Sequence, residues 1–307
     1  MHNKPFAPLT LDFTFKRAFA TEKNKHILIS LINTFLSEKL ENPLKEVLLI
    51  NTVQPPKTEE HRGAIFDLHC EDTLGNKFIV EMQLAGQMHF IERLLFYISQ
   101  AIVNAAGKGS EYDYSLPRIY CLSFLDFIPK DIGDIGDGSG ESVQYISLAN
   151  DKHPDIRYKY ISISLAMLPK FTKTVEQCES LQDWWLYLFN HMHELDDMPP
   201  ELLRLSEKAF QDLFETAKIA RFTKSELLDY EEKMKQWNDS KAIMDYAVAT
   251  GFERGIEKGI EKGREEAREE TLEEVFSLLR QGYSVDEAER MLAKREAKSM
   301  AGGMESC

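Results

Sequence analysis

The chain has 307 residues and a formal net charge of −14, with 43% hydrophobic and 29% charged residues, the composition of an ordinary globular protein. No stretch is apolar for long enough to cross a membrane, and the first residues lack a signal-peptide pattern, so we expect a cytoplasmic protein. Four cysteines without paired spacing argue against a zinc site or a disulfide framework. The first 110 residues contain 12 basic and 12 acidic residues, so the acidic excess lies beyond them. Charge therefore does not predict strong nonspecific nucleic-acid binding.

The periodicity of apolar residues predicts an α/β protein with a mixed sheet. Helical spacing of apolar residues is found over 12–20, 25–40 and 87–106, and Asn24 is a candidate cap for the second of these helices. Strand-like segments are found at 46–50, 65–71, 77–83, 118–127 and 153–165. Residues 131–141 are rich in Gly and Asp at a spacing that no calcium loop uses, which predicts a solvated surface loop.

Two strand-like segments flank a turn at 72–76 and alternate polar with apolar residues, which predicts a half-buried hairpin. If Glu71 pairs with Lys77, the register places Asp67 directly opposite Glu81. Two carboxylates that face each other repel and should destabilise the sheet, and a bound cation would reverse that effect. The apolar residues expected together on the other face are Phe66, Leu68, Cys70, Phe78, Val80 and Met82.

Asp67 and Glu81 are suitable ligands for Mg²⁺, or for Mn²⁺, and the carbonyl of Met82 is a candidate third ligand. Gln83 shares a face with Glu81 because the two are two residues apart on a strand. The Gln83 side chain is therefore expected to orient a water molecule or a phosphate oxygen beside the metal. Asp12 is interpreted either as a helix N-cap or as a further acid of the site.

The predicted helix over 87–106 carries Arg93, Tyr97 and Gln100 on the side away from its apolar stripe. These three residues are candidate DNA contacts if the helix packs beside the hairpin, and Arg93 suits a phosphate. A solvated or ion-paired arginine is the alternative for Arg93. His69 and Glu71 share the Asp67 face and are expected to be ordinary exposed positions.

Three regions are expected: 1–172, a helical domain over 173–250, and a charged tail over 251–307. The tail begins with four Gly-x-Glu tetrads, whose glycines stand at 251, 255, 259 and 263. Such a stripe either lets a second helix approach, which would give a homodimer, or marks a weakly stable helical spacer. His191 and His193 have metal-ligand spacing, but no neighbouring ligand accompanies them, so a loop is the expected setting.

The sequence resembles the Rpn family of recombination-promoting nucleases, which are transposase-like proteins of the PD-(D/E)XK nuclease superfamily. The resemblance covers most of the chain and is strongest over 5–127. The matching residues are Asp12-Phe13-Thr14-Phe15-Lys16, Phe66-Asp67-Leu68, Asp72, Gly75, Asn76, Ile79-Val80-Glu81-Met82-Gln83, Arg93, Tyr97 and Gly109-Ser110-Glu111-Tyr112.

The resemblance implies a restriction-endonuclease-like αβββαβ core followed by helices, and a metal-dependent DNA endonuclease linked to recombination, mobile elements or defence. It assigns metal binding to Asp67 and Glu81. Gln83 stands where the wider superfamily has lysine, and Asp12 lies near the position of a first-helix acid. The alternative is a noncatalytic DNA-binding or assembly protein with a degenerate site, which the missing lysine and the acidic overall charge favour.

Overall fold

The computed structural model describes residues 4–54, 64–86, 89–105, 115–129, 140–287 and 290–291, without the side chains of 53, 54, 64, 65, 244 and 267. The chain divides into two compact units, Met1–Trp237 and Asn238–Cys307. None of the helices described is long and apolar enough to cross a membrane.

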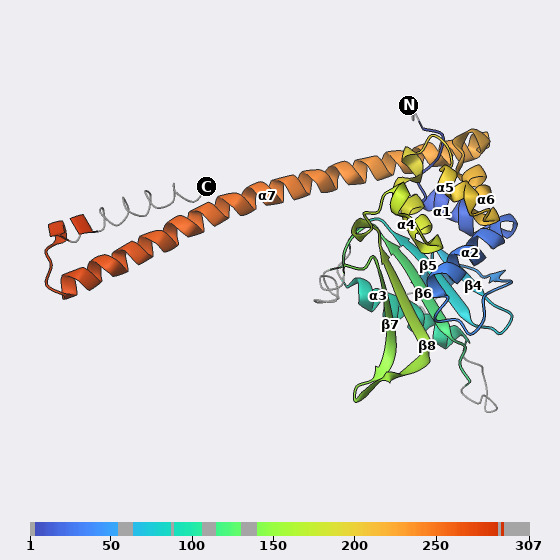
Figure 1. Cartoon of the computed structure of the whole chain (residues 1–307), viewed down its shortest axis with the longest axis horizontal. Coiled ribbons are helices and arrows are strands. Elements are labelled where there is room, and N and C mark those ends of the chain that lie inside the picture. The colour runs from blue at the N-terminus through green and yellow to red at the C-terminus, as the bar shows by residue number, and fades with distance from the viewer. Residues whose placement is uncertain are drawn as a thin grey trace. The chain divides into compact units, whose positions relative to one another are not determined.

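A six-stranded mixed sheet forms the centre of the first unit, with the strand order β1-β4-β5-β6-β8-β7 (Figure 1). Strands β5, β6 and β8 are parallel to one another, whereas β1, β4 and β7 run antiparallel to their neighbours. The strands of this sheet are β1 (Leu48–Leu49), β4 (Leu68–Glu71), β5 (Lys77–Gln83), β6 (Ile119–Leu125), β7 (Val143–Asn150) and β8 (His153–Met167). A separate two-stranded sheet pairs β2 (Val53–Gln54) with β3 (Ala64–Ile65). The predicted α/β class with a mixed sheet is confirmed.

Helices cover both faces of the sheet. The α-helices are α1 (Asp12–Phe19), α2 (Lys25–Leu36), α3 (Phe90–Ala105), α4 (Leu181–His191), α5 (Pro200–Arg204), α6 (Lys208–Ala217) and α7 (Lys224–Arg280). Short 3₁₀ helices are found at Glu22–Asn24, Leu168–Lys170, Val175–Gln177, Met192–Glu194 and Ile219–Arg221. One face of the sheet shares a hydrophobic cluster with α1, α2, α4 and α6, and the other face shares a cluster with α3. The prediction of a half-buried hairpin over 65–71 and 77–83 is wrong, because helices on both faces of the sheet bury the interior of β4 and β5.

The hairpin departs from the predicted faces at one residue. Leu68 and Cys70 join the cluster on the α2 face as expected, but Phe66 joins the cluster on the α3 face. The cause is a break in the strand, since β3 ends at Ile65 and β4 begins only at Leu68. Asp67 lies in this break. A continuous strand would use its backbone N–H and C=O groups to pair with a neighbouring strand, whereas in the break these groups are available to bond side chains.

Three other expectations need correction. Asp12 is the first helical residue of α1, and the N-cap position belongs to Leu11. Asn24 does not cap α2 with its side chain; its Nδ2 donates to the carbonyl of Arg17 at 2.9 Å and ties the two helices together. Residues 143–150 form a strand that the sequence did not predict, whereas most of the loop over 131–141 lies outside the described residues.

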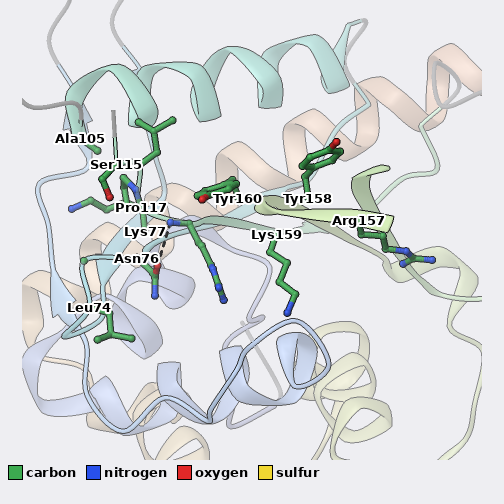
Figure 2. A pocket seen from close by; sticks show the side chains of 13 residues that line it. Leu74, Asn76, Lys77, Ala105, Ser115, Pro117, Arg157, Tyr158, Lys159 and Tyr160 are labelled. Carbon is green, nitrogen blue, oxygen red and sulfur yellow. Dashed lines mark hydrogen bonds between the residues drawn. The ribbon is translucent and has the colours of Figure 1, made fainter. Parts of the chain in front are cut away.

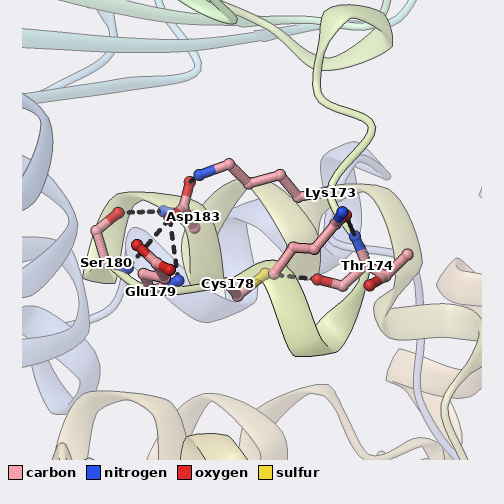
Figure 3. Close-up of polar contacts among 7 residues, drawn as sticks. Lys173, Thr174, Cys178, Glu179, Ser180 and Asp183 are labelled. Atoms are coloured by element: carbon pink, nitrogen blue, oxygen red, sulfur yellow. Dashed lines mark hydrogen bonds and ion pairs between the residues drawn. The ribbon is translucent and has the colours of Figure 1, made fainter.

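The helices after the sheet belong to the same hydrophobic core as the sheet. Trp185 and Phe189 of α4 and Phe210 of α6 share a cluster with side chains of α1 and α2, and the Phe189 ring stacks on Phe124 of β6 at 4.2 Å. Ser180 caps α4 by accepting from the Asp183 backbone amide at 3.0 Å (Figure 3). The predicted domain boundary between residues 172 and 173 therefore lies inside one compact unit.

In the second unit, α7 continues through the glycine tetrads as an uninterrupted helix. A Cβ added at Gly251, Gly255, Gly259 or Gly263 would meet no described atom within 4 Å. The helix ends at a turn in which Gly282 adopts a φ of +95°, and Ser284 then donates to Glu287 at 2.8 Å to open a short helical segment.

Gly255→Ala and Gly259→Ala are expected to stabilise α7 by about 1 kcal/mol each, because alanine reduces the conformational freedom of the unfolded helix. Thermal melting followed by circular dichroism measures the gain. Gly282→Ala is the control and should destabilise the turn, because φ at this position lies in the region that side chains disfavour. A loss of helix stability in Gly255→Ala or Gly259→Ala would contradict the prediction.

Candidate metal and nuclease site

The two acids of the hairpin meet as the sequence predicted. Glu71 pairs with Lys77 and Leu68 pairs with Val80, so the register places Asp67 opposite Glu81. The Asp67 backbone amide donates to Oε1 of Glu81 at 3.3 Å. The Met82 backbone amide donates to Oδ2 of Asp67 at 2.8 Å. Each carboxylate therefore accepts a hydrogen bond from a backbone amide of the other acid or of its neighbour.

Burial opposes the ionisation of both carboxyl groups, of which Glu81 is buried and Asp67 is half-buried. Glu81 is only 2% exposed, and burial together with the nearby Asp67 carboxyl raises the pKa of Glu81 to about 8. Burial also raises the pKa of Asp67, although the hydrogen bond from Met82 acts in the opposite direction. The cause in both cases is loss of hydration of the charged form. A bound cation would favour both ionised forms at once.

Gln83 contacts Glu81 directly. Its Nε2 donates to Oε2 of Glu81 at 3.2 Å, and its backbone carbonyl accepts from the Asp126 amide at 2.9 Å. The amide of Gln83 therefore orients the carboxylate of Glu81 and adds no charge. The Met82 backbone amide contacts the Asp67 carboxylate. A role for the Met82 carbonyl as a metal ligand remains a prediction.

Arg93 and Tyr97 of α3 lie on the buried side of the helix, next to the acids. The charge of Arg93 lowers the pKa of both Asp67 and Glu81. Its guanidinium lies 5.4 Å from the ring centre of Phe90 and 5.8 Å from that of Tyr97. The prediction that this stripe points away from the apolar face is wrong, because α3 presents it to the sheet beside Glu81. Arg93 thus supplies positive charge close to the acid pair.

Tyr97 packs edge-on against Phe66, the residue that precedes Asp67, with 5.3 Å between the ring centres. Burial raises the pKa of the Tyr97 phenol. Gln100 is half-buried and stands two helical turns beyond Arg93, about 10 Å along the axis. Its role as a DNA contact stays a prediction.

A pocket of about 650 Å³ opens onto Asp67 and is lined by residues that are far apart in sequence. Asp12 and Lys16 of α1 line it and form an ion pair at 2.7 Å. Glu226, Asp229, Glu232 and Lys233, from the first turns of α7, line it as well. Sequence reasoning did not assign site roles to Lys16 or to these residues of α7, since no local pattern brings α7 to the hairpin.

Other candidate groups lie elsewhere or in unreactive settings. His69 is 3% exposed, not exposed as expected, and burial lowers its pKa to about 4. His191 and His193 stand at the end of α4, where both contact Glu194. Burial raises the pKa of the Cys70 and Cys121 thiols to about 12, and both cysteines are free. None of these groups adds a ligand to the acid pair.

The chemistry of the acid pair fits a hard divalent cation. Mg²⁺ takes one or two carboxylates and keeps several waters, and the buried pair offers two oxygen donors whose mutual repulsion a cation relieves. Within the described part of the chain, no group of three or more His, Cys, Asp or Glu side chains is arranged to hold a metal ion.

Comparison with known families agrees with this geometry. Residues 9–247, well over half of the chain, match the family described as PD-(D/E)XK nuclease family transposase, whereas curated proteins and solved structures gave no match. The match includes the acid pair, Lys16 and the start of α7, and the mixed sheet with its helices is consistent with a restriction-endonuclease-like fold. The chain belongs to the PD-(D/E)XK nuclease family transposases.

Proposed function

We propose that this protein is a metal-dependent DNA endonuclease that acts in recombination or in processes linked to mobile elements or defence. Its family supports a nuclease-type function. The observation that carries the finer proposal is the pair formed by the half-buried Asp67 and the buried Glu81, held together by backbone hydrogen bonds. Ionisation of this pair is opposed by burial unless a cation accompanies it.

In this proposal Asp67 and Glu81 hold Mg²⁺, with the carbonyl of Met82 as a further candidate ligand. When bound, the cation would neutralise phosphate charge and activate a water molecule. Gln83 fixes the orientation of Glu81, and Arg93 adds positive charge next to the pair. A catalytic role for Asp12 is supported by its place in the pocket that opens onto Asp67.

Lys16 is the cation best placed to provide the charge that Gln83 lacks. It lines the same pocket as Asp67 and lowers the pKa of that carboxyl, against the larger effect of burial. Its side chain is 48% exposed, so it can reach a phosphate that enters the pocket. Preorganised positive charge near the reacting phosphate stabilises charge that develops in the transition state.

Lys16→Met is therefore expected to lower the rate of plasmid nicking by about 100-fold, the usual effect of removing one such group. Lys16→Arg keeps the charge and should lose much less activity. Single-turnover rates separate this effect from weaker DNA binding. An unchanged single-turnover rate in Lys16→Met would exclude a role for Lys16 in the chemical step.

A noncatalytic DNA-binding or assembly protein remains the second candidate, favoured by Gln83 in place of lysine. Plasmid nicking in Mg²⁺ tests the endonuclease directly, and Asp67→Ala and Glu81→Ala are the decisive variants. Isothermal titration with Mn²⁺ adds a readout that does not depend on activity. Mn²⁺ binding that is lost in Asp67→Asn supports the proposed site, whereas no binding by the wild type favours the noncatalytic protein.

A further inference from the structure

A second pocket, of about 810 Å³, lies at the opposite end of β5 from the acids. The strand rises about 13 Å from Lys77, which lines this pocket, to Glu81. The far end of α3 and the projecting first half of β8 form other parts of the pocket (Figure 2). It is therefore distinct from the pocket at Asp67.

The described lining of this pocket is basic, in a chain with a net charge of −14. Four cationic side chains and no acidic ones line it: Lys77, Arg118, Arg157 and Lys159. Lys77 pairs with Glu71, and Arg118 pairs with Glu41 at 2.6 Å. No described residue forms an ion pair with Arg157 or Lys159. Lys159 attracts Glu41 without forming an ion pair with it, since its charge is among the smaller causes that lower the pKa of that carboxyl after the Arg118 hydrogen bond. Positive charge at Arg157 and Lys159 therefore remains to attract an anion.

Two tyrosines alternate with these cations along β8. Tyr158 is 53% exposed and Tyr160 is 56% exposed, and Figure 2 shows their rings on one side of the strand and Lys159 on the other. Residues two apart on a strand lie about 6.7 Å apart. This is twice the roughly 3.4 Å rise of a stacked nucleotide strand, so a base can fit between the two rings. Before Ile161 the β6 side of β8 has no described strand partner, so a nucleic-acid strand that lies along this edge can reach the rings on one side and the cations on the other (Figure 2). Exposed aromatic rings combined with nearby cations are the usual platform for unpaired bases.

We propose that this surface binds single-stranded nucleic acid, with bases on Tyr158 and Tyr160 and phosphates at Arg157 and Lys159. This inference rests on the proposed function, because it assumes that the protein's substrate is nucleic acid. It adds a contact at least about 13 Å along β5 from the cleavage site, which would let the protein hold an unpaired strand beside the duplex it cuts. An acidic peptide would match the charge but would not use the pair of exposed rings.

Fluorescence anisotropy of the full-length protein with a labelled single-stranded oligodeoxynucleotide tests this surface, in EDTA so that no cleavage occurs. Arg157→Gln combined with Lys159→Gln is expected to weaken binding by about 10-fold. The slope of log affinity against log salt should fall by roughly 0.7 for each phosphate that the variant no longer neutralises. Tyr158→Ala combined with Tyr160→Ala should also weaken binding by about 10-fold, and the corresponding pair of Phe substitutions should bind like the wild type because the rings remain.

Lys45→Gln combined with Lys224→Gln is the matched control, since it removes the same charge from two exposed positions outside both pockets and should change binding less than about 2-fold. Equal weakening in this control and in the Arg157 and Lys159 pair would overturn the proposal. So would the absence of oligonucleotide binding in a protein that nicks duplex DNA, a result that leaves the proposed nuclease intact. Binding by a protein that nicks nothing would leave this surface standing and reject the nuclease.

Discussion

Replacing Glu81 by glutamine is expected to lower Mg²⁺-dependent DNA nicking by at least about 1,000-fold. The substitution keeps the size of the side chain but removes one of two carboxylates that hold the cation, whose stabilisation of the transition state is worth several kcal/mol. Glu81 is only 2% exposed and accepts from the Asp67 amide, so little solvent is available to compensate for the lost carboxylate. Asp67→Asn is expected to have a comparable effect.

Initial rates of plasmid nicking measure this loss, and Mn²⁺ titration measures the accompanying loss of metal binding. Glu46→Gln is a suitable control because it makes the same change at an exposed acid outside the site. Its nicking rate should equal that of the wild type. A Glu81→Gln protein that nicks within about 10-fold of the wild-type rate would show that the acid pair is not the metal site.

The metal-free protein is expected to lose stability as pH rises from 6.5 to 8. The pKa of Glu81 is raised to about 8 in the folded protein, whereas an unfolded glutamate has a pKa near 4.3. Between these values the folded state binds more protons than the unfolded state, so the free energy of unfolding falls with increasing pH. The fall is about 1.4 kcal/mol per pH unit, or about 2 kcal/mol over this window. For a chain of 307 residues, with an unfolding entropy of about 2.1 cal/mol/K per residue, we expect a decrease of about 3 °C in Tm.

His69 has the opposite effect on stability, because it lowers the free energy of unfolding as pH decreases, and only below about pH 6.5. Its folded pKa of about 4 lies below the unfolded value near 6.5, so stability that comes from the neutral imidazole is lost as pH falls below 6.5. Above pH 6.5 both states carry neutral His69, and Glu81 dominates. Differential scanning calorimetry in EDTA should show a steeper decrease for the wild type than for Glu81→Gln. Parallel pH profiles would contradict the raised pKa of Glu81.

The hairpin shows how far local sequence pattern predicts the candidate site. The alternation of polar and apolar residues and the polar turn at 72–76 determined the register of Asp67 and Glu81, because a hairpin links residues that are close in the chain. The same pattern placed Phe66 on the wrong face. Alternation assumes a continuous strand, and the break at Asp67 turns Phe66 toward Tyr97.

The long-range parts of the site could not be predicted from periodicity. Lys16 approaches Asp67 through the packing of α1, and Glu226 reaches the same pocket because Arg17 pairs with it and Tyr230 is buried beside Phe13. These contacts depend on tertiary packing between segments that are distant in sequence, and the contacts to α7 join segments more than 150 residues apart. The burial of the central strands β4, β5 and β6 has the same origin, since α4 covers a sheet that precedes it in the chain.

The central claim is that Asp67 and Glu81 together hold a divalent cation. Anomalous diffraction from crystals soaked in Mn²⁺ tests it most directly, with crystals of Asp67→Asn as the comparison. The account predicts a single strong peak within about 2.0–2.4 Å of an oxygen of each carboxylate, and no peak there in the variant. A Mn²⁺ ion bound elsewhere, in crystals of a protein that retains nicking activity, would contradict it.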